Sequence, residues 1–360
     1  MINAKPNICL CIKSIDPTVA SGTKRYAYEL YRELKNNKKY NIFLITAPKN
    51  SIYEKSGTFF VIFCFYKLLK LLSKKKIDLF HSLSFAYSPF IPIVKLFGVK
   101  TAITIADVPK TYSTKYMDNG ILDYIKIWLY RIFIRYSDYF FAISKLNIER
   151  LQKEIRISKK RIFYFPHGID QKFKPLTSIK REKDFTIGYL GGMISLKNIK
   201  YTIELIKTFI EFNKNHSDSL LIISGKDKLS FVEKFIKKIN HKKIKYIKFI
   251  PESDIVNFYN SLDVFIFPSL YEGFGLAIME AKRCGKPVLL IKKAMISNEV
   301  KKYCYEYDSK EDLIEKLSNF YLNRSLIKLI GEKSYRDAKK FTWKKSVEAA
   351  INGYKKILKK

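Results

Sequence analysis

Acidic residues are scarce in this chain. Its 360 residues include 33 Asp and Glu against 68 Lys and Arg, which gives a formal net charge of +35 at pH 7. A positive surplus of this size favours anionic partners, either a membrane surface rich in acidic lipid or nucleic acid. No recognised nucleic-acid-binding module accompanies the charge, so we expect no nucleic acid partner. A composition rich in Lys, Ile and Asn can also reflect the base composition of a genome.

Long apolar runs and a cysteine framework are missing too. No run of 18 or more apolar residues occurs, so no helix is expected to span a membrane. Residues 1–15 read as a first strand rather than as a signal peptide. The five cysteines are scattered and odd in number, which is typical of a reducing compartment. Cys9 and Cys11 alternate within a strand-like run, which favours a shared core face over a metal site.

What the chain does contain is an alternation of strand-like apolar runs and helical stretches. The strand-like runs cover residues 8–15, 42–46, 77–82, 101–105, 139–143 and 161–165, then 185–190, 220–224, 244–250, 264–267 and 288–291. Alternation of this kind predicts parallel sheets covered by helices. The chain is therefore predicted to be an α/β protein with two Rossmann-like, doubly wound halves.

The boundary between the halves is predicted near Pro175. The stretch before it contains Pro166, Gly168 and a charged run, which is the composition of a linker. The predicted domains are residues 1–175 and 176–340, and residues 341–360 are predicted to form a separate C-terminal helix.

Residues 263–287 predict a strand, a glycine loop and a helix in succession. The apolar run 264–267 reads as a strand that is buried on both faces. Gly273 and Gly275 fall in the loop, and apolar residues return at helical spacing from Leu276.

This geometry suits an anionic ligand that also carries hydroxyl groups. Glycines let the backbone approach a ligand, and free N–H groups at a helix start favour an anion such as a diphosphate. Glu272 in the loop and Glu280 in the helix can accept hydrogen bonds from two sets of hydroxyls. A phosphate and two hydroxyl-rich patches describe a nucleotide-sugar. The plainer alternative is that acidic residues near a helix start are ordinary dipole partners.

The string PSLYEGFGLAIMEAKRCGKPV at residues 268–288 resembles the E-x7-E signature of the retaining glycosyltransferases of family 4, also called glycosyl transferases group 1. The strand, the EGFG loop, the second Glu and the closing GKPV follow in the family's order. The resemblance implies a GT-B fold, in which two Rossmann-like, doubly wound domains face a central cleft. It also implies an N-terminal acceptor domain, a C-terminal nucleotide-sugar donor domain, and a last helix that returns to the first domain.

The resemblance also implies roles around the donor. Glu280 would bind the ribose, Glu272 the transferred sugar, and the amides of residues 273–275 the leaving diphosphate. Lys197 stands six residues after Gly191 and matches the Lys of the family's G-R-x4-K, where a fixed cation stabilises that diphosphate. The candidate donor site comprises Gly22, Gly191, Lys197, Glu272, Gly273, Phe274, Gly275, Leu276 and Glu280.

Two positions depart from the family's pattern. Gly192 replaces the Arg of G-R-x4-K, and Ala106 replaces a His that precedes Asp107. Asp107 is nevertheless a candidate catalytic residue, with Lys197 and Glu272, and would bind acceptor or sugar hydroxyls. An Asp at the end of a strand is alternatively a helix cap. The two replacements leave open a catalytically impaired relative that binds a nucleotide-sugar or glycan without transfer.

Other turns are similar to those of the family. Gly22 opens the first helix and matches the second glycine of a GG loop, although a plain turn also explains a single glycine. Ser144 matches an A-x-S turn near the nucleotide, and His167 replaces the Asn of a P-N-G-V-D turn at the inter-domain cleft. Glu299 matches a further family position.

The implied function is retaining transfer of a sugar from a UDP- or GDP-linked donor to a hydroxyl of a lipid-linked or cell-surface glycan. No His pairs with a carboxylate at metal-ligand spacing and no D-x-D motif occurs, so neither a metal nor a cofactor is predicted. The expected location is the cytoplasm, with peripheral contact at the inner face of the membrane.

Residues 59–72 and 125–136 combine aromatic and aliphatic residues with Lys or Arg and contain no acidic residue. Helices of this composition can lie in a membrane interface, and the net charge supports docking on anionic lipid. Phe and Leu at helical spacing are equally typical of a helix that packs on a core or between domains. The sequence leaves both interpretations open.

Overall fold

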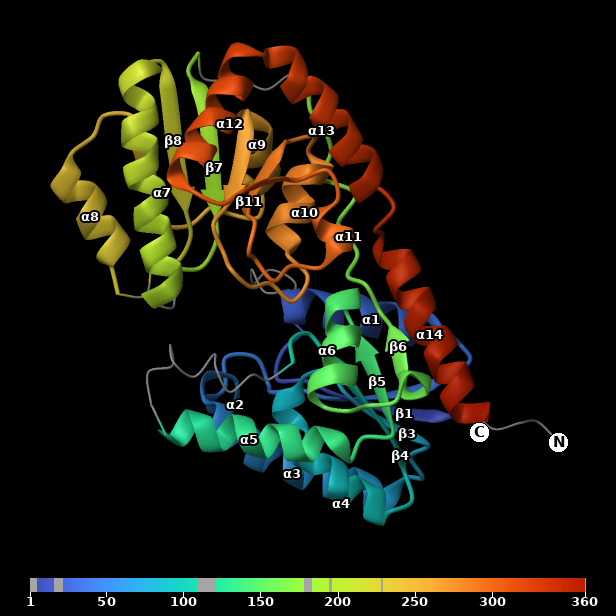
Figure 1. The fold of residues 1–360 in the computed structure, drawn as a ribbon. Helices are drawn as coiled ribbons and strands as arrows, with labels where there is room; N and C mark the ends of the chain where they lie inside the picture. Colours follow the sequence, from blue (N-terminus) through green and yellow to red (C-terminus); the bar gives the residue numbers. More distant parts are fainter. Residues whose placement is uncertain are drawn as a thin grey trace. The chain divides into compact units, whose positions relative to one another are not determined.

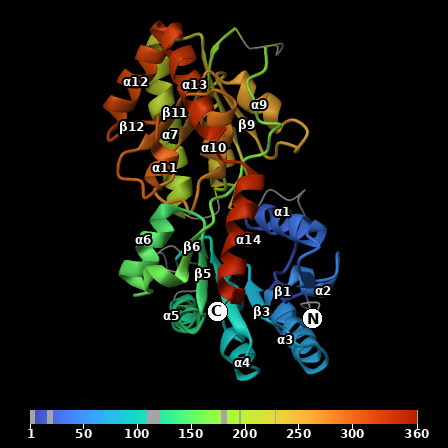
Figure 2. The same cartoon turned by 90° about the vertical axis from the view of Figure 1, so that its right-hand side faces the viewer.

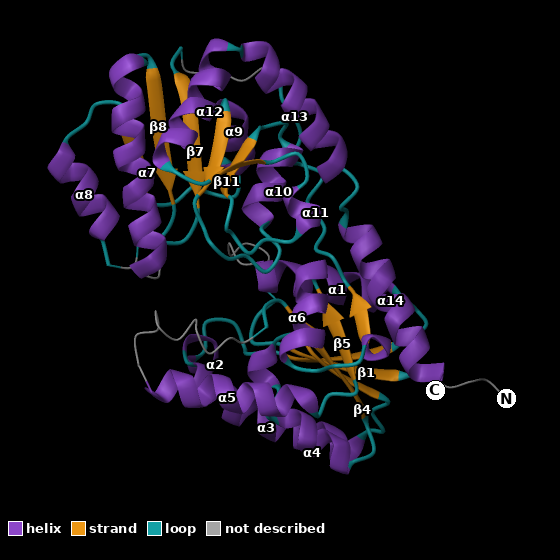
Figure 3. Cartoon of the chain, in the orientation of Figure 1, coloured by secondary structure: helices purple, strands orange, loops and turns teal. Residues whose placement is uncertain are grey.

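The computed structural model describes residues 5–15, 22–108, 121–177, 183–193, 196–227 and 229–359. The chain divides into two compact units (Figure 1). The first consists of residues 1–168 and 343–360, and the second of residues 169–342. Each unit has a sheet of six strands flanked by helices (Figure 3), so the predicted pair of doubly wound α/β halves is confirmed.

The first sheet has the strand order β2-β1-β3-β4-β5-β6, with all neighbouring strands parallel. Its strands are β1 (Asn7–Cys11), β2 (Asn41–Ile45), β3 (Leu79–Ser82), β4 (Lys100–Ile105), β5 (Tyr139–Ala142) and β6 (Ile162–Tyr164). The helices of this unit are α1 (Gly22–Asn36), α2 (Ile52–Lys55), α3 (Gly57–Lys74), α4 (Phe90–Leu96), α5 (Ile121–Arg135), α6 (Lys145–Glu154) and α14 (Trp343–Lys359).

The strand β1, which lies between β2 and β3, is buried in the core. Cys9 and Cys11 are both fully buried, as the strand pattern predicted, and the Sγ atom of Cys11 lies 3.1 Å from that of Cys64 in α3. Burial raises the pKa of the Cys9 and Cys11 thiols far above the usual range. These cysteines therefore pack as small apolar side chains.

The last helix, α14, packs on the first sheet. Figure 2 shows it between α1 and β6, and it contacts both. The Tyr354 hydroxyl lies 2.6 Å from Nδ1 of the buried His81 on β3, whose Nε2 lies 2.9 Å from Thr104 Oγ1 on β4. The chain thus leaves the first unit after Gly168 and re-enters it at Trp343.

The second sheet has the order β12-β11-β10-β7-β8-β9, again with parallel neighbours. Its strands are β7 (Phe185–Leu190), β8 (Ser219–Ser224), β9 (Ile244–Ile247), β10 (Val264–Phe267), β11 (Val288–Ile291) and β12 (Tyr305–Tyr307). Its helices are α7 (Leu196–Asn215), α8 (Phe231–Ile239), α9 (Ile255–Ser261), α10 (Leu276–Arg283), α11 (Asn298–Lys301), α12 (Lys310–Leu322) and α13 (Arg324–Ala338).

Candidate functional site

The two loops with predicted phosphate-binding glycines follow neighbouring strands. β7 and β10 pair directly, with Ile187 opposite Val264. The chain runs outward from β7 to β9 on one side and from β10 to β12 on the other, so the strand order reverses between β7 and β10. In open parallel sheets, ligands bind outside the carboxyl ends of the strands at such a switch point. The topology therefore brings the two loops together at the carboxyl ends of the strands in the second sheet.

The backbone of the loop after β7 packs directly on the backbone of the loop after β8. The amide of Gly191 donates to the carbonyl of Ser224 at 3.0 Å. Gly225 has a φ of +138°, and a Cβ atom there would lie 2.0 Å from the carbonyl oxygen of Gly191. Glycine is thus required where the loops after β7 and β8 meet. A side chain at Gly191 would in turn meet the Tyr189 hydroxyl at 2.6 Å.

Lys197 is the second residue of α7, which starts beside this loop. Asn198, the next residue, donates from Nδ2 to the Gly192 carbonyl at 3.0 Å and ties the helix start to the loop. The side chain of Lys197 lies outside the described part of the structure. Its role in neutralising a diphosphate stays a prediction from the sequence.

The loop after β10 holds Glu272 and is fixed by its backbone. The Glu272 amide donates to the Met295 carbonyl at 3.2 Å, and the Met295 amide donates to the Leu270 carbonyl at 2.8 Å. The Phe274 side chain is buried, with its ring 5.9 Å from that of Phe341. The side chain of Phe274 anchors the loop in the core, so the residue can offer a ligand only its backbone, which is the contact predicted for the amides of residues 273–275.

The helix α10 begins directly after Gly275. This glycine has a φ of +82° and a ψ of 57°, a left-handed conformation that other residues rarely adopt. In the described structure no side chain caps the start of α10. The first N–H groups of the helix, from Leu276 onward, are therefore suited to an anionic ligand at the positive end of the macrodipole.

Glu280 lies one turn further along α10 and is held by a tyrosine that the sequence interpretation missed. The hydroxyl of Tyr259, on α9, donates to Glu280 Oε2 at 2.9 Å. Tyr259 is fully buried, and burial, followed by the nearby Glu280 charge, raises its pKa well above the usual range. The phenol therefore stays protonated and orients the carboxylate. The two residues are 21 positions apart, so no local pattern could have revealed the contact.

The far side of α10 is fastened to α11 and α13. Lys282 is fully buried and donates to Asp337 Oδ2 at 2.9 Å and to the Val300 carbonyl at 3.1 Å. The backbone of α13 also lies close to the backbone just after α10: a Cβ atom on Gly331 would be 2.2 Å from the Gly285 carbonyl oxygen. These contacts fix the position of α10, and with it the position of Glu280.

The remaining site predictions, Gly22 and Asp107, fall in the first unit. Gly22 is the first residue of α1, and the residues just before it lie outside the described structure. Asp107 follows β4, and its Oδ1 accepts from Nη1 of Arg150 at 2.8 Å. Arg150 is buried, whereas 46% of the Asp107 side chain is exposed. Asp107 is thus an ion-pair partner of a buried arginine of α6, which the sequence did not indicate.

Ser144 and His167 have structural partners. The Ser144 hydroxyl accepts from the Asn147 amide at 3.2 Å and caps α6. The buried His167 ring lies between Tyr26 and Trp343, with ring centroids 5.1 and 5.8 Å away. Burial lowers the pKa of His167 to about 3, so the imidazole is neutral at pH 7.

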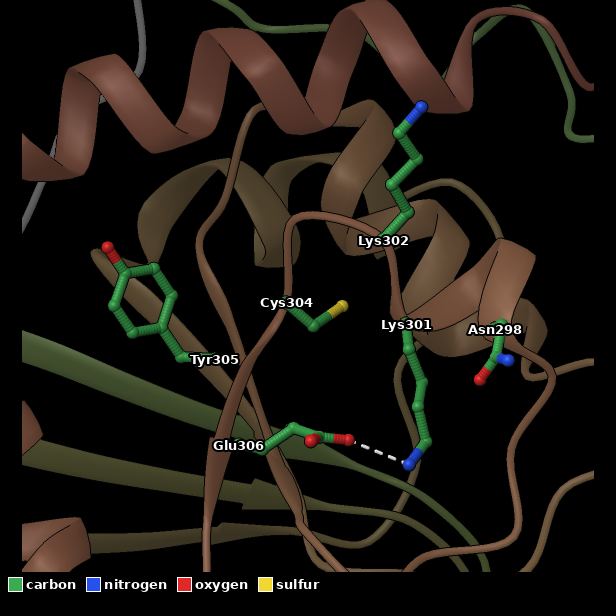
Figure 4. A pocket seen from close by; sticks show the side chains of 6 residues that line it. All are labelled: Asn298, Lys301, Lys302, Cys304, Tyr305 and Glu306. Atoms are coloured by element: carbon green, nitrogen blue, oxygen red, sulfur yellow. Dashed lines mark hydrogen bonds and ion pairs between the residues drawn. The ribbon is translucent and has the colours of Figure 1, made fainter.

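A hollow on the second unit lies beside α11 and β12, and Figure 4 shows its lining residues. They are Asn298, Lys301, Lys302, Cys304, Tyr305 and Glu306. Lys301 and Glu306 point toward each other, with Nζ 2.7 Å from Oε1 (Figure 4). Burial raises the pKa of Cys304 to about 12, so its thiol is not a nucleophile at neutral pH. None of the predicted donor residues lines this hollow.

Neither a metal centre nor a membrane-spanning helix is found in the described residues. No three His, Cys, Asp or Glu side chains among them are grouped so that they could hold an ion. No helix within the described ranges has the length and apolarity needed to cross a bilayer. Metal-independent action stays a prediction.

Two family models match the chain in succession. Residues 20–173 match the model described as Glycosyltransferase Family 4, and residues 170–337 match the one described as Glycosyl transferases group 1. The second match contains all the candidate donor residues except Gly22.

Curated relatives are similar over about two thirds of the chain. An uncharacterized glycosyltransferase of Methanocaldococcus jannaschii is 26% identical over 236 residues, which are 63% of this chain and 63% of that protein, so less than two thirds of it is matched. A UDP-Gal:alpha-D-GlcNAc-diphosphoundecaprenol alpha-1,3-galactosyltransferase of Escherichia coli is 26% identical over 267 residues, 69% of this chain and 68% of that protein.

A solved structure is similar over nearly the whole chain. Sucrose-phosphate synthase of Thermosynechococcus elongatus superimposes with a TM-score of 0.76 at 14% identity, over 98% of this chain and 99% of that one. This likeness concerns the fold.

Proposed function

Because the chain belongs to the family 4 glycosyltransferases and has the GT-B fold, we propose that it transfers a sugar from a nucleoside-diphosphate sugar to a glycan hydroxyl. The observation that carries the proposal is the meeting of two loops at the switch point between β7 and β10. One loop presents glycine backbone, and the other presents Glu272 and an uncapped helix start, with Glu280 in that helix.

Each part of this site fits one part of the donor. The N–H groups at the start of α10 suit the diphosphate, and Lys197 would add a cation near the start of α7. Glu280, oriented by Tyr259, would accept hydrogen bonds from the ribose hydroxyls. Glu272, on a loop fixed against Met295, would do the same for the transferred sugar.

The proposed reaction is a retaining transfer without a metal. As the bond between the sugar and the diphosphate breaks, negative charge builds on the leaving phosphate oxygens, and the α10 amides with Lys197 would stabilise it. The acceptor hydroxyl would attack the anomeric carbon from the face that the diphosphate leaves. We assign no protein nucleophile and no cofactor beyond the donor substrate.

The Escherichia coli relative guides the choice of substrates. Its name specifies a UDP-linked sugar and an acceptor on diphosphoundecaprenol. We therefore propose a UDP-sugar as donor ahead of a GDP-sugar, and a lipid-linked glycan as acceptor ahead of other cell-surface glycans. The proposed place of action is the cytoplasmic face of the membrane, and no nucleic acid takes part.

A second candidate function is binding of a nucleotide-sugar or glycan without transfer. It is motivated by Gly192 and Ala106, which stand where the family carries Arg and His. Both residues lie in described loops, and Asn147 Nδ2 donates to the Ala106 carbonyl at 3.0 Å. The two functions differ in turnover, so a binding experiment must be paired with an activity assay.

Calorimetric titration with UDP, GDP and their sugars tests the donor site. Glu280→Ala is expected to weaken UDP binding at least tenfold, because the hydroxyl acceptor is lost, whereas Glu332→Ala, on the exposed side of α13, should bind as the wild type does. Glu272→Ala should retain UDP but lose sugar transfer to a lipid-linked acceptor. Equal affinities of the wild type and Glu280→Ala would contradict the donor site. Binding without transfer by the wild type would favour the second function.

A further inference from the structure

Three helices of the first unit form one layer on the same face of its sheet. The connections that contain α3, α4 and α5 all cross the sheet in the same direction, from β2 to β3, β4 and β5. Right-handed crossovers then place the three helices on one face. Figures 1 and 2 show them side by side along one border of the unit, and the Phe65 ring of α3 stacks on Phe90 of α4 at 6.5 Å. We call their outward surface the α3–α5 face.

The outward side of α3 is apolar where a polar side is expected. Phe60, Cys64 and Leu68 point inward and are fully buried. Phe59, Ile62 and Tyr66, at the complementary helical spacing, are exposed, and Ile62 is exposed to 61%. A helix on a water-facing surface normally carries polar residues there. This helix therefore has two apolar sides, of which the core covers only one.

The neighbouring helices continue the apolar surface. Ile127 and Ile134 of α5 are buried, whereas Ile125 and Leu129 are exposed and Trp128 is exposed to 53%. At the end of α4, Leu96 is exposed to 85%. Exposed apolar side chains concentrated on one helix layer favour an interaction site over the scattered exposure of ordinary surfaces.

The charge on the α3–α5 face is predominantly positive. Basic side chains border the apolar residues, and they are Lys67, Lys70, Lys74, Lys95, Arg131 and Arg135. Lys67 and Lys70 lie over the rings of Phe63 and Tyr66, at 5.5 and 5.9 Å from the ring centroids. No Asp or Glu occurs among the side chains that the structure describes in these three helices. Two acidic residues beside them are paired with basic ones, Asp138 with Lys95 at 2.6 Å and Glu154 of α6 with Arg131 at 3.9 Å, so Lys67, Lys70, Lys74 and Arg135 carry most of the positive charge.

We propose that the α3–α5 face docks on the surface of an anionic lipid bilayer. Aromatic and aliphatic side chains would enter the headgroup region, and the flanking lysines and arginines would meet lipid phosphates. A second copy of the chain fits the face less well, because two basic faces and a net charge of +35 per chain would repel each other. The proposal rests on the proposed function only for the presence of a lipid-linked acceptor at that surface.

Flotation of the full chain with vesicles tests the docking. The wild type should bind vesicles of phosphatidylglycerol and phosphatidylethanolamine, and should bind phosphatidylcholine vesicles at least tenfold more weakly. Ile62→Glu with Trp128→Glu should lower the partition coefficient on anionic vesicles at least tenfold. The matched control is Leu322→Glu with Leu329→Glu, which places the same two charges on leucines that are 77% and 50% exposed in the second unit, and it should bind as the wild type does. Equal binding by all three proteins, or no binding by the wild type, would overturn the proposal.

Tryptophan fluorescence gives a second readout at the face itself. The chain has two tryptophans, Trp128 and Trp343, so Trp343→Phe leaves Trp128 as the single probe. Its emission should shift to the blue with anionic vesicles and be quenched by brominated lipid, and an unchanged spectrum would contradict insertion.

Sedimentation equilibrium without lipid tests whether a second copy of the chain covers the face instead. A dimer that is abolished by the double substitution would overturn the bilayer proposal. UDP titration without vesicles tests the donor site independently. A protein that binds UDP but not anionic vesicles would contradict the docking proposal alone.

Discussion

At the scale of single residues, the contact between Tyr259 and Glu280 makes the clearest prediction. Tyr259→Phe removes a hydroxyl that donates to a carboxylate at 2.9 Å and changes little else in a fully buried ring. A hydrogen bond to a charged group contributes about 1.5–3 kcal/mol. We therefore expect UDP affinity to fall about tenfold, with a smaller loss than in Glu280→Ala, as measured by calorimetry.

The control for this positioning role is another tyrosine of the second unit. Tyr321→Phe removes a hydroxyl that donates to Asp218, on an exposed part of the unit. It should leave the UDP affinity unchanged. If Tyr259→Phe lowers the thermal stability but leaves the UDP affinity intact, Tyr259 is a core residue only.

Two buried histidines of the first unit predict a pH dependence of stability. Burial lowers the pKa of His81 and of His167 to about 3, whereas an unfolded histidine titrates near 6.5. Between these pH values the unfolded chain binds more protons than the folded one. The contribution of each histidine to the free energy of unfolding is therefore fully present only above pH 6.5, and it is lost as the pH falls. From pH 6.5 to 5 the free energy of unfolding should drop by about 2 kcal/mol for each histidine.

Urea unfolding at several pH values, with a His167→Phe variant, measures this effect. Phenylalanine keeps an aromatic ring between Tyr26 and Trp343 but does not titrate. The variant should therefore lose about 2 kcal/mol less than the wild type between pH 6.5 and 5. The same slope in both proteins would show that His167 does not contribute to the acid sensitivity.

Residue roles were predictable from the sequence only where they depend on local geometry. Gly275 was recognisable because a glycine loop before a helix has a local signature, and its left-handed conformation fits it. The partners of Glu280 and Asp107, which are Tyr259 and Arg150, lie 21 and 43 positions away in the chain and have no such signature. The motif that contains Phe274 likewise did not reveal that its ring packs on Phe341, while the predicted role of its backbone amide stays a prediction.

At the scale of elements, strand burial explains what could be predicted. Strands of a parallel sheet are covered on both faces and appear as continuous apolar runs, so the eleven strands from β1 to β11 were recognisable. The strand β12, Tyr305–Tyr307, was missed because Glu306 at its centre interrupts the apolar run that marks the other strands. The order of the strands was not specified from the sequence, yet that order brings the two glycine loops together.

The helices α3 and α5 show a limit of periodicity arguments. From their sequences, each helix could lie in a membrane interface or pack on a core, because apolar residues occur on more than one side of the helix. The structure shows that the inner side of each helix packs on the sheet core while the outer side stays exposed. The packed-core interpretation therefore holds for the inner side, whereas contact of the outer side with a membrane stays a prediction.

At the scale of the whole molecule, the first unit is built from two separate segments, residues 1–168 and 343–360. This division predicts which unit each of two glycine substitutions destabilises. A Cβ atom on Gly353 of α14 would lie 2.6 Å from Cε1 of the buried Phe141, and one on Gly331 of α13 would lie 2.2 Å from the Gly285 carbonyl oxygen. Both Gly→Ala substitutions overpack a close contact and should destabilise the protein by about 1–3 kcal/mol.

Amide hydrogen exchange distinguishes the two effects by location. Because residues 343–360 belong to the first unit, Gly353→Ala should speed exchange in β1, β3 and β5 and leave β7 and β10 protected. Gly331→Ala should do the reverse, since its contact lies wholly in the second unit. Each variant therefore serves as the control for the other. If either substitution speeds exchange in both sheets equally, the two units unfold as one cooperative structure, and α14 couples them instead of completing the first.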